Sequence, residues 1–335
     1  MAELNPGAFA FVMATGIVSN ALVHGGSATI SAVLALIAAV GYAVLWAVYL
    51  WRWVCWRERF LADLAGPYGF AFLTIVAASG VLARRLALGG LYGAAEVLTV
   101  LGAAGWLVLG YGVPLVLICT GRARPLRQVN GSWFLWVVGT ESVAVAVASV
   151  GAATGGRELG AVAALCWAVG LLQYLLVAAL VLARLLLEPV EPAELLPPYW
   201  IFMGAAAISV LAGAVLLQLP AGMALLPRPF VLGVSAVLWA FCTWLIPLLL
   251  AFGVWRHALR GVPLRYEGSL WSLVFPVGMY GVGTGELGRA AGWGWMVGFG
   301  AAEAWVALAV WAAVFLGMLV AAAAALRRPG GPGPG

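Results

Sequence analysis

Short breaks rich in Gly, Pro and Arg divide the chain into ten long apolar segments. A membrane-spanning helix needs about 20 predominantly apolar residues, and no break is long enough to hold a separate soluble domain. Charged residues make up only 9% of the chain, against roughly 25% in soluble domains. The segments cover residues 6–24, 28–52, 66–84, 91–119, 132–152, 159–187, 197–218, 230–255, 269–287 and 297–326. The sequence therefore predicts an all-α integral membrane protein with ten transmembrane helices.

The domain organisation follows from the same pattern. We expect a single transmembrane domain over residues 1–328 and a disordered Gly/Pro tail over residues 329–335.

Several kinds of chemistry lack the residues they need. The chain has no Lys, a single Asp (Asp63) and two His (His24 and His257) that are far apart in the sequence. Without Lys the chain cannot form a Schiff base, and with one Asp it cannot form a two-Asp protease site. Two distant His cannot form a multi-His metal site or a bis-haem site. The four cysteines show no CxxC spacing and predict free thiols: Cys55, Cys119, Cys166 and Cys242. We expect no enzyme activity, no metal and no cofactor.

The arginines are distributed unevenly. Twelve lie in the breaks after even-numbered segments or near the C-terminus, and five lie on the opposite side. The positive-inside rule then predicts that both termini are cytoplasmic, in the inner (plasma) membrane of a cell. The net charge of +5 is explained by anionic lipid, so we expect no nucleic-acid partner.

Odd-numbered segments contain more small and hydroxyl residues than the bulky even-numbered ones. Small and polar faces suit helices that pack inside a bundle or line water, whereas bulky faces suit lipid. We therefore place the odd helices inside and the even helices outside. The candidate pore-lining residues are Thr15, Ser19, Thr74, Ser79, Thr140, Glu141, Ser142, Ser209, Gly278 and Thr284.

The odd segments also form a weak repeat. Each opens with an aromatic residue just after a Gly or Pro, and these aromatics are 61, 64, 66 and 71 residues apart. This spacing predicts five parallel helical hairpins around an axis along the membrane normal, which would enclose a central channel. The alternative is that the aromatics only form an interfacial belt.

Four stretches resemble a known family: 5–19 (NPGAFAFVMATGIVS), 133–140 (WFLWVVGT), 197–204 (PPYWIFMG) and 271–280 (WSLVFPVGMY). They are similar to the tellurite-resistance/C4-dicarboxylate transporter family, which includes the plant slow-type anion channels. The resemblance implies five hairpins around a pore lined by odd helices, usually in a homotrimer.

The resemblance also implies a gate on the ninth helix, where a Phe beside a Pro blocks the pore. The matching residues are Phe275 and Pro276. Independently of the family, Pro276 removes a backbone hydrogen bond and kinks its helix, and a hydrophobic constriction closes a narrow pore by excluding water. The alternative is that Phe275 is only a packing aromatic.

Glu141 lies about ten residues into the fifth segment, where an ionisable group is costly and is a functional candidate. Either it is held by structural hydrogen bonds, or it has a proton-coupling or selectivity role. At the outer ends of the segments, we expect Glu286 to pair with Arg289, and Glu96 to pair with Arg84 or its neighbour.

These features predict an anion channel that conducts small inorganic anions such as chloride or nitrate. The alternative is a proton-coupled secondary transporter of C4-dicarboxylates or tellurite, which Glu141 favours.

Overall fold

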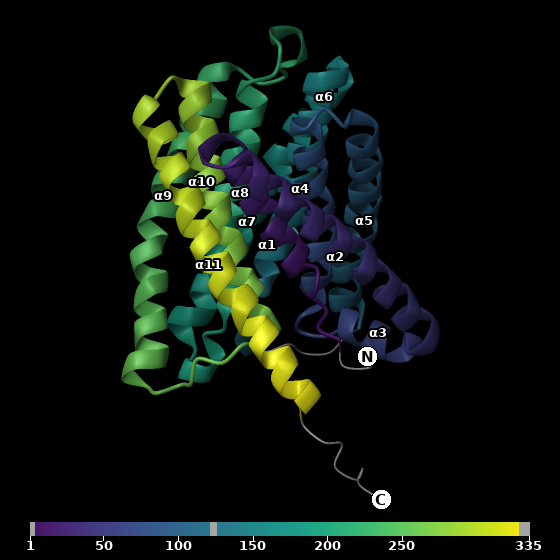
Figure 1. Ribbon diagram of the computed structural model, residues 1–335, viewed down its shortest axis with the longest axis vertical. Helices are drawn as coiled ribbons and strands as arrows, with labels where there is room; N and C mark the ends of the chain where they lie inside the picture. Colours follow the sequence, from purple (N-terminus) through teal and green to yellow (C-terminus); the bar gives the residue numbers. More distant parts are fainter. Residues whose placement is uncertain (1–3, 121–125, 328–335) are drawn as a thin grey trace, which may run out of the picture.

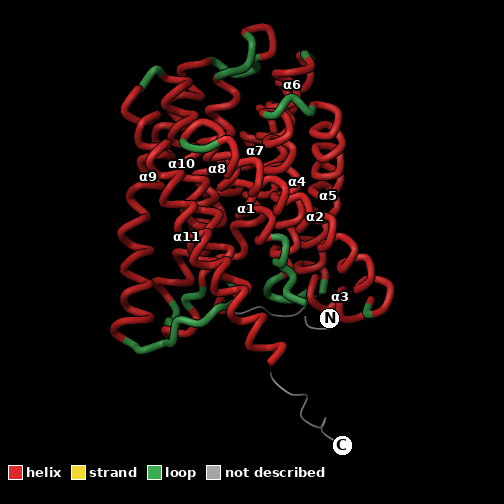
Figure 2. Tube along the Cα trace, in the orientation of Figure 1, coloured by secondary structure: helices red, strands yellow, loops and turns green. Residues whose placement is uncertain are grey.

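The computed structural model describes residues 4–120 and 126–327, and every regular element in these ranges is helical (Figure 2). This confirms the all-α prediction. The Gly/Pro tail predicted over 329–335 lies outside the described residues.

In the described part of the chain, ten helices of 15 or more residues form two sets. The first set is α1 (Ala10–Gly25), α4 (Thr74–Leu88), α6 (Phe134–Thr154), α8 (Ile201–Leu217) and α10 (Trp271–Ala291). The second set is α2 (Ala28–Cys55), α5 (Tyr92–Cys119), α7 (Arg157–Leu187), α9 (Arg228–Val254) and α11 (Gly294–Arg327). A short helix, α3 (Arg57–Leu64), follows α2.

The first set closes into a ring. α1 packs against α4, α4 against α6, α6 against α8, α8 against α10, and α10 returns to α1. Each helix of the second set packs mainly against the ring helix that precedes it in the chain. Figure 1 shows α1 starting and α11 ending at the same, lower end of the bundle. We call the first set the inner helices and the second set the outer helices.

Burial separates the two sets sharply. In the most apolar window of α4, α6 and α8, 78–94% of residues are buried, against 17–39% in the five outer helices. Bulky apolar side chains left uncovered on this scale suit a lipid surface. The protein is therefore an integral membrane protein, as the sequence predicts.

Eight helices are long and apolar enough to cross a membrane by length and composition, in the part of the chain that the structure describes. The other two long helices are inner ones. α1 has only 16 residues, and α10 is less apolar because it contains five glycines and Glu286. Both are mostly buried, so neighbouring helices, and not lipid, surround them.

A tight turn precedes four of the inner helices. These 3-10 turns cover Gly69–Leu73, Gly131–Trp133, Pro197–Trp200 and Gly268–Leu270. A Cβ on Gly131 would lie 2.3 Å from the carbonyl oxygen of Pro198, so the backbones of two neighbouring turns touch and only glycine fits.

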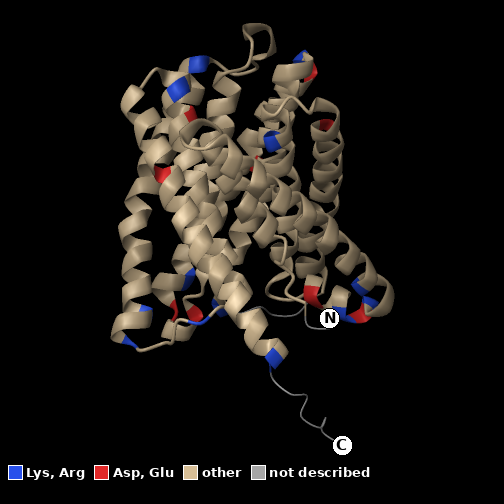
Figure 3. Cartoon of the chain, viewed as in Figure 1, with Lys and Arg blue, Asp and Glu red and all other residues tan. Residues whose placement is uncertain are grey.

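Charged side chains gather mainly at the two ends of the bundle (Figure 3). Beside the turns that start the inner helices, Arg184 pairs with Glu194 at 2.8 Å. At the opposite end, Arg84 and Arg289 both pair with Glu286.

Candidate functional site

Three glycine contacts show how α10 is turned within the ring. A Cβ on Gly204 of α8 would lie 2.8 Å from Cγ of Pro276, and a Cβ on Gly278 would lie 3.0 Å from Cγ2 of Ile17 on α1. Gly281 packs against α11 in the same close manner. These contacts assign three sides of α10 to α8, α1 and α11, and Tyr280 and Thr284 turn a fourth side toward α9. The side that is left faces the centre of the ring.

That side of α10 contains Phe275, Met279, Val282 and Glu286, which are spaced i, i+4, i+7 and i+11 and therefore share one helical face. Phe275 and Met279 have no surface that water can reach. Side chains therefore fill the centre of the ring at the level of Phe275. Phe275 lies four residues into α10, and Glu286 lies roughly 16 Å farther along the helix axis at 1.5 Å per residue.

A polar cluster surrounds Glu286 at the far end of the ring. Its Oε1 pairs with the Arg84 guanidinium of α4 and with Arg289 at 3.0 Å. Its Oε2 accepts a hydrogen bond from Nε2 of Gln218 at 3.0 Å. Arg84 also donates to Oγ of Ser149 on α6 at 3.5 Å. Because α1 stands between α4 and α10 in the ring, the Arg84–Glu286 pair crosses the ring's interior.

The pairing of Glu286 with Arg289 is confirmed. The pairing expected for Glu96 is wrong among the described residues, because Arg84 pairs with Glu286 and Arg85 donates to Oγ of Ser19. A partner 202 residues away cannot be found from local spacing. The available signal was that Arg84 and Glu286 both lie near the far ends of inner segments.

Five of the predicted lining hydroxyls face the outer helices and not the ring's centre. Each bonds a side chain of an outer helix: Thr15 with Trp311, Ser19 with Ser31, Ser79 with Tyr42, Thr140 with Trp106 and Thr284 with Trp239. The physical reason is that a buried hydroxyl needs a partner, and the outer helices supply indole N–H or hydroxyl groups. The small-residue composition of an inner helix does not reveal which face carries them.

The other hydroxyl candidates differ from one another. Thr74 donates to the carbonyl of Ala71 within its own turn. Ser209 donates to its own helix, and its carbonyl accepts the indole N–H of Trp167. Oγ of Ser142 is buried with no hydrogen-bond partner in the described chain. Ser142 itself packs against Gly80 of α4, where a Cβ added to the glycine would lie 2.9 Å from Ser142 Cβ.

Glu141 is fully buried and points from α6 toward α7. A Cβ on Gly170 would lie 2.4 Å from its Oε1, and Ser209 of α8 is close enough to interact with its carboxyl group. Neither carboxyl oxygen has a partner of good hydrogen-bond geometry among residues 4–120 and 126–327. Glu141 therefore occupies the contact between inner and outer helices.

A cavity of about 390 Å³ lies at the lower end, between the turns that start α4, α6 and α8. Arg184 and Glu194 line it. The backbone N–H of Glu191 donates to Glu194 at 3.1 Å. That bond, together with Arg184, lowers the pKa of Glu194.

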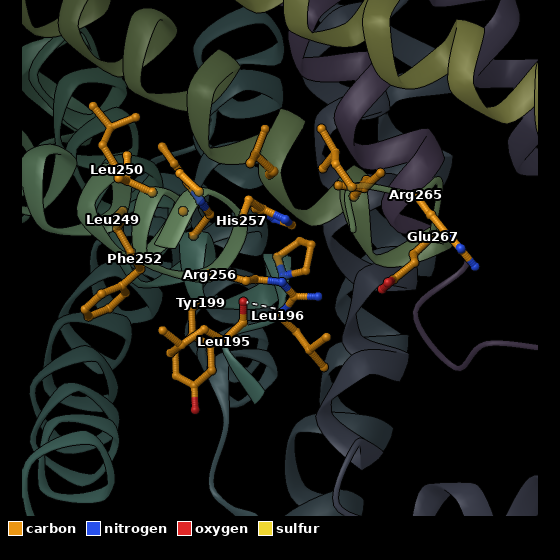
Figure 4. A pocket seen from close by; sticks show the side chains of 18 of the residues that line it. Leu195, Leu196, Tyr199, Leu249, Leu250, Phe252, Arg256, His257, Arg265 and Glu267 are labelled. Atoms are coloured by element: carbon orange, nitrogen blue, oxygen red, sulfur yellow. Dashed lines mark hydrogen bonds between the residues drawn. The ribbon is translucent and has the colours of Figure 1, made fainter. Parts of the chain in front are cut away.

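A second cavity, of about 380 Å³, lies beside the end of α9 and is mostly apolar (Figure 4). Arg256 donates to the carbonyl of Leu195 at 2.7 Å, and Figure 4 shows this bond beside His257, with Arg265 and Glu267 farther along the wall. The Arg256 guanidinium thus ties the segment before α8 to the end of α9, which is a structural role outside the inner ring.

No group of three His, Cys, Asp or Glu side chains that could hold a metal occurs among the residues described here.

Comparisons with known proteins match this chain to one family model and to several membrane proteins. A sequence model described as voltage-dependent anion channel matches residues 3–319. An uncharacterised membrane protein of Mycobacterium tuberculosis is 52% identical over 158 residues, covering 47% of this chain and 80% of that protein. An uncharacterised transporter of Methanocaldococcus jannaschii is 26% identical over 285 residues, covering 82% and 81% of the two chains. The chain belongs to the voltage-dependent anion channel family.

Proposed function

We propose that this protein is an anion channel that conducts small inorganic anions through the centre of the inner ring. The observation that carries the proposal is the closed ring of five buried helices with the Phe275 face of α10 turned toward its centre. A ring of this kind offers a path separated from lipid by the outer helices.

Phe275 is the proposed gate. The following residue, Pro276, cannot donate a backbone hydrogen bond and packs against Gly204. The backbone of α10 is therefore held in place directly beside Phe275, whose phenyl group must move to open the path. A benzyl group across an apolar passage excludes water and therefore excludes ions. Selectivity among small anions would rest mainly on pore width and on weak dipoles.

We further propose that residues 1–328 form one domain of ten spans in five parallel hairpins, with both termini cytoplasmic in the inner membrane. The 12-to-5 distribution of arginines supports this orientation. Exposed apolar outer helices supply surface for lipid and for the subunit contacts of a homotrimer.

A second candidate is a proton-coupled transporter of C4-dicarboxylates or tellurite. The observation that favours it is Glu141, whose carboxyl group is buried without a hydrogen-bond partner among the described residues. A protonation cycle at this group could couple proton flux to substrate flux.

The test is flux of chloride, nitrate and malate in proteoliposomes, with and without a pH gradient. A channel passes chloride or nitrate down the electrical gradient regardless of the pH gradient, and Phe275→Ala raises this flux. A carrier accumulates malate only with the pH gradient and loses this uptake in Glu141→Gln. Absence of anion flux in both wild type and Phe275→Ala would contradict the channel.

Phe202→Ala is the matched control for the gate. Phe202 is also buried, but its ring stacks on Phe134 of α6 and contacts Tyr174 and Phe241 of the outer helices. Both variants lose the same side-chain volume, and only loss of Phe275 should open the path.

A further inference from the structure

The charges at the far end of the ring do not balance. Arg84 and Arg289 share the single carboxylate of Glu286. The side chains of Arg84 and Glu286 are only 6% and 4% exposed. No second carboxylate interacts with Arg84 in the described part of the chain, and His24, which faces the same charges, adds no negative charge. One positive charge is therefore left without a counter-charge at this end of the ring, and it is shared between the buried Arg84 and Arg289, whose side chain is 34% exposed.

Unused hydrogen-bonding atoms lie beside this charge. Nε of Arg84 and Oδ1 of Asn20 are buried and have no hydrogen-bond partner among the described residues. A cavity of about 30 Å³ lies between α1, α10 and α11; Asn20, His24, Glu286 and Arg289 are among the residues that line it, whereas Arg84 is not. About one water-sized particle fits such a space. A free N–H donor on Arg84 and an excess positive charge suit a small anion, and the cavity beside Glu286 and Arg289 offers space next to them.

The cluster also lies on the proposed path. Glu286 is on the same face of α10 as Phe275, and roughly 16 Å beyond it. Its pair with Arg84 spans the ring from α10 to α4. An anion leaving the Phe275 level must therefore pass this pair.

We propose that Arg84 and Arg289, sharing Glu286, form a binding site for a small monovalent anion at the far end of the ring, and that this site selects anions over cations. The proposal rests on the channel function. The anion replaces Glu286 on Arg84, while Arg289 and Gln218 continue to hold the displaced carboxylate. Arg84 thus has a negative partner both before and after the anion binds, and the excess positive charge of the cluster repels cations in both states.

Selectivity is measured as the reversal potential of reconstituted protein in a KCl gradient. All variants are made in the Phe275→Ala background, so that the apolar constriction is open. Arg84→Gln should lower the anion/cation permeability ratio at least about fivefold, and Glu286→Gln should raise it, because each changes the local charge by one unit. Unchanged ratios in conducting channels would overturn the proposal.

Arg228→Gln is the matched control. Arg228 is at the same end but donates to the carbonyls of Leu217 and Ala290 and forms no ion pair with Glu286 in the described chain. Its loss should change the ratio less than about twofold at physiological salt, because Arg228 is exposed and salt screens exposed charges much more than buried ones. A ratio that falls equally in Arg228→Gln and Arg84→Gln would show a general surface-charge effect and contradict a site.

Binding is measured separately, without conduction, as the melting temperature in nitrate or chloride against gluconate. Wild type should melt higher with the small anion. The double variant Arg84→Gln/Glu286→Gln keeps the local net charge of the cluster but should lose this difference. An anion-dependent shift retained in the double variant would overturn the site. If the Phe275→Ala protein conducts no anions but its melting temperature still rises with the small anion in a way that depends on Arg84, the channel function is refuted. The anion-binding site is then still supported.

Discussion

The contact between Gly204 and Pro276 offers a sharp test of how α10 is held. An alanine at 204 would place its Cβ 2.8 Å from Cγ and 3.0 Å from Cβ of the Pro276 ring. Carbon atoms normally pack at about 3.5–4.0 Å, so the two helices must separate by roughly 0.7 Å or more. The proline ring is rigid and cannot rotate away. Overpacking of this kind typically costs about 1–3 kcal/mol.

Gly233→Ala in α9 is the control, since nothing lies within 4 Å of a Cβ added there. Both substitutions place alanine inside a helix and gain the same helix propensity. The difference in unfolding free energy between the two variants therefore isolates the clash.

The assay is thermal or denaturant unfolding of the purified variants, followed by anion leak in proteoliposomes. We expect Gly204→Ala to be less stable than Gly233→Ala by about 1–3 kcal/mol and to leak more, because Pro276 directly follows Phe275. Equal stability and equal leak in the two variants would refute the close α8–α10 contact and the turn of α10 inferred from it.

Three further predictions concern the contacts between helices and the lower end of the bundle. Trp239→Phe removes the indole donor to Thr284 and should cost about 0.5–1.5 kcal/mol of unfolding free energy; unchanged stability would show that this bond contributes nothing. Gly170→Ala should destabilise the wild type more than the Glu141→Ala variant, because the added Cβ would meet the Glu141 carboxyl group at 2.4 Å; equal costs would place Glu141 elsewhere. The pKa of Glu194 is lowered from 4.5 in the folded protein, so its carboxylate stabilises the fold above that pH, and the contribution is lost as the pH falls through the lowered pKa. Glu194→Gln should reduce this acid sensitivity in pH-dependent unfolding, and an unchanged pH profile would contradict it.

Much of the fold could be predicted because it depends on the length and mean hydropathy of each segment, and these do not depend on the position of any single residue. Apolar runs such as 132–152 became helices such as α6 (Phe134–Thr154), since runs of this length and hydropathy have few alternatives in a bilayer. The richness of the odd segments in small residues predicted which helices are buried, and α6 and α8 are among the most buried.

The faces of those helices could not be predicted in the same way. Thr15 and Thr284 are in the inner helices as expected, yet both bond tryptophans of the outer helices. A hydroxyl satisfies its hydrogen bonds wherever a donor is available, and that depends on a neighbour whose position the local sequence does not contain. The Arg84–Glu286 pair was missed for the same reason, because its members come from helices that are not adjacent in the ring.

The most direct test of the central claim is the current through single reconstituted molecules carrying Phe275→Ala or Phe202→Ala. If the Phe275 face of α10 closes a path through the inner ring, Phe275→Ala produces sustained anion currents and Phe202→Ala remains as closed as wild type. Currents of equal size in both variants, or in neither, would contradict a conduit through the ring that Phe275 closes.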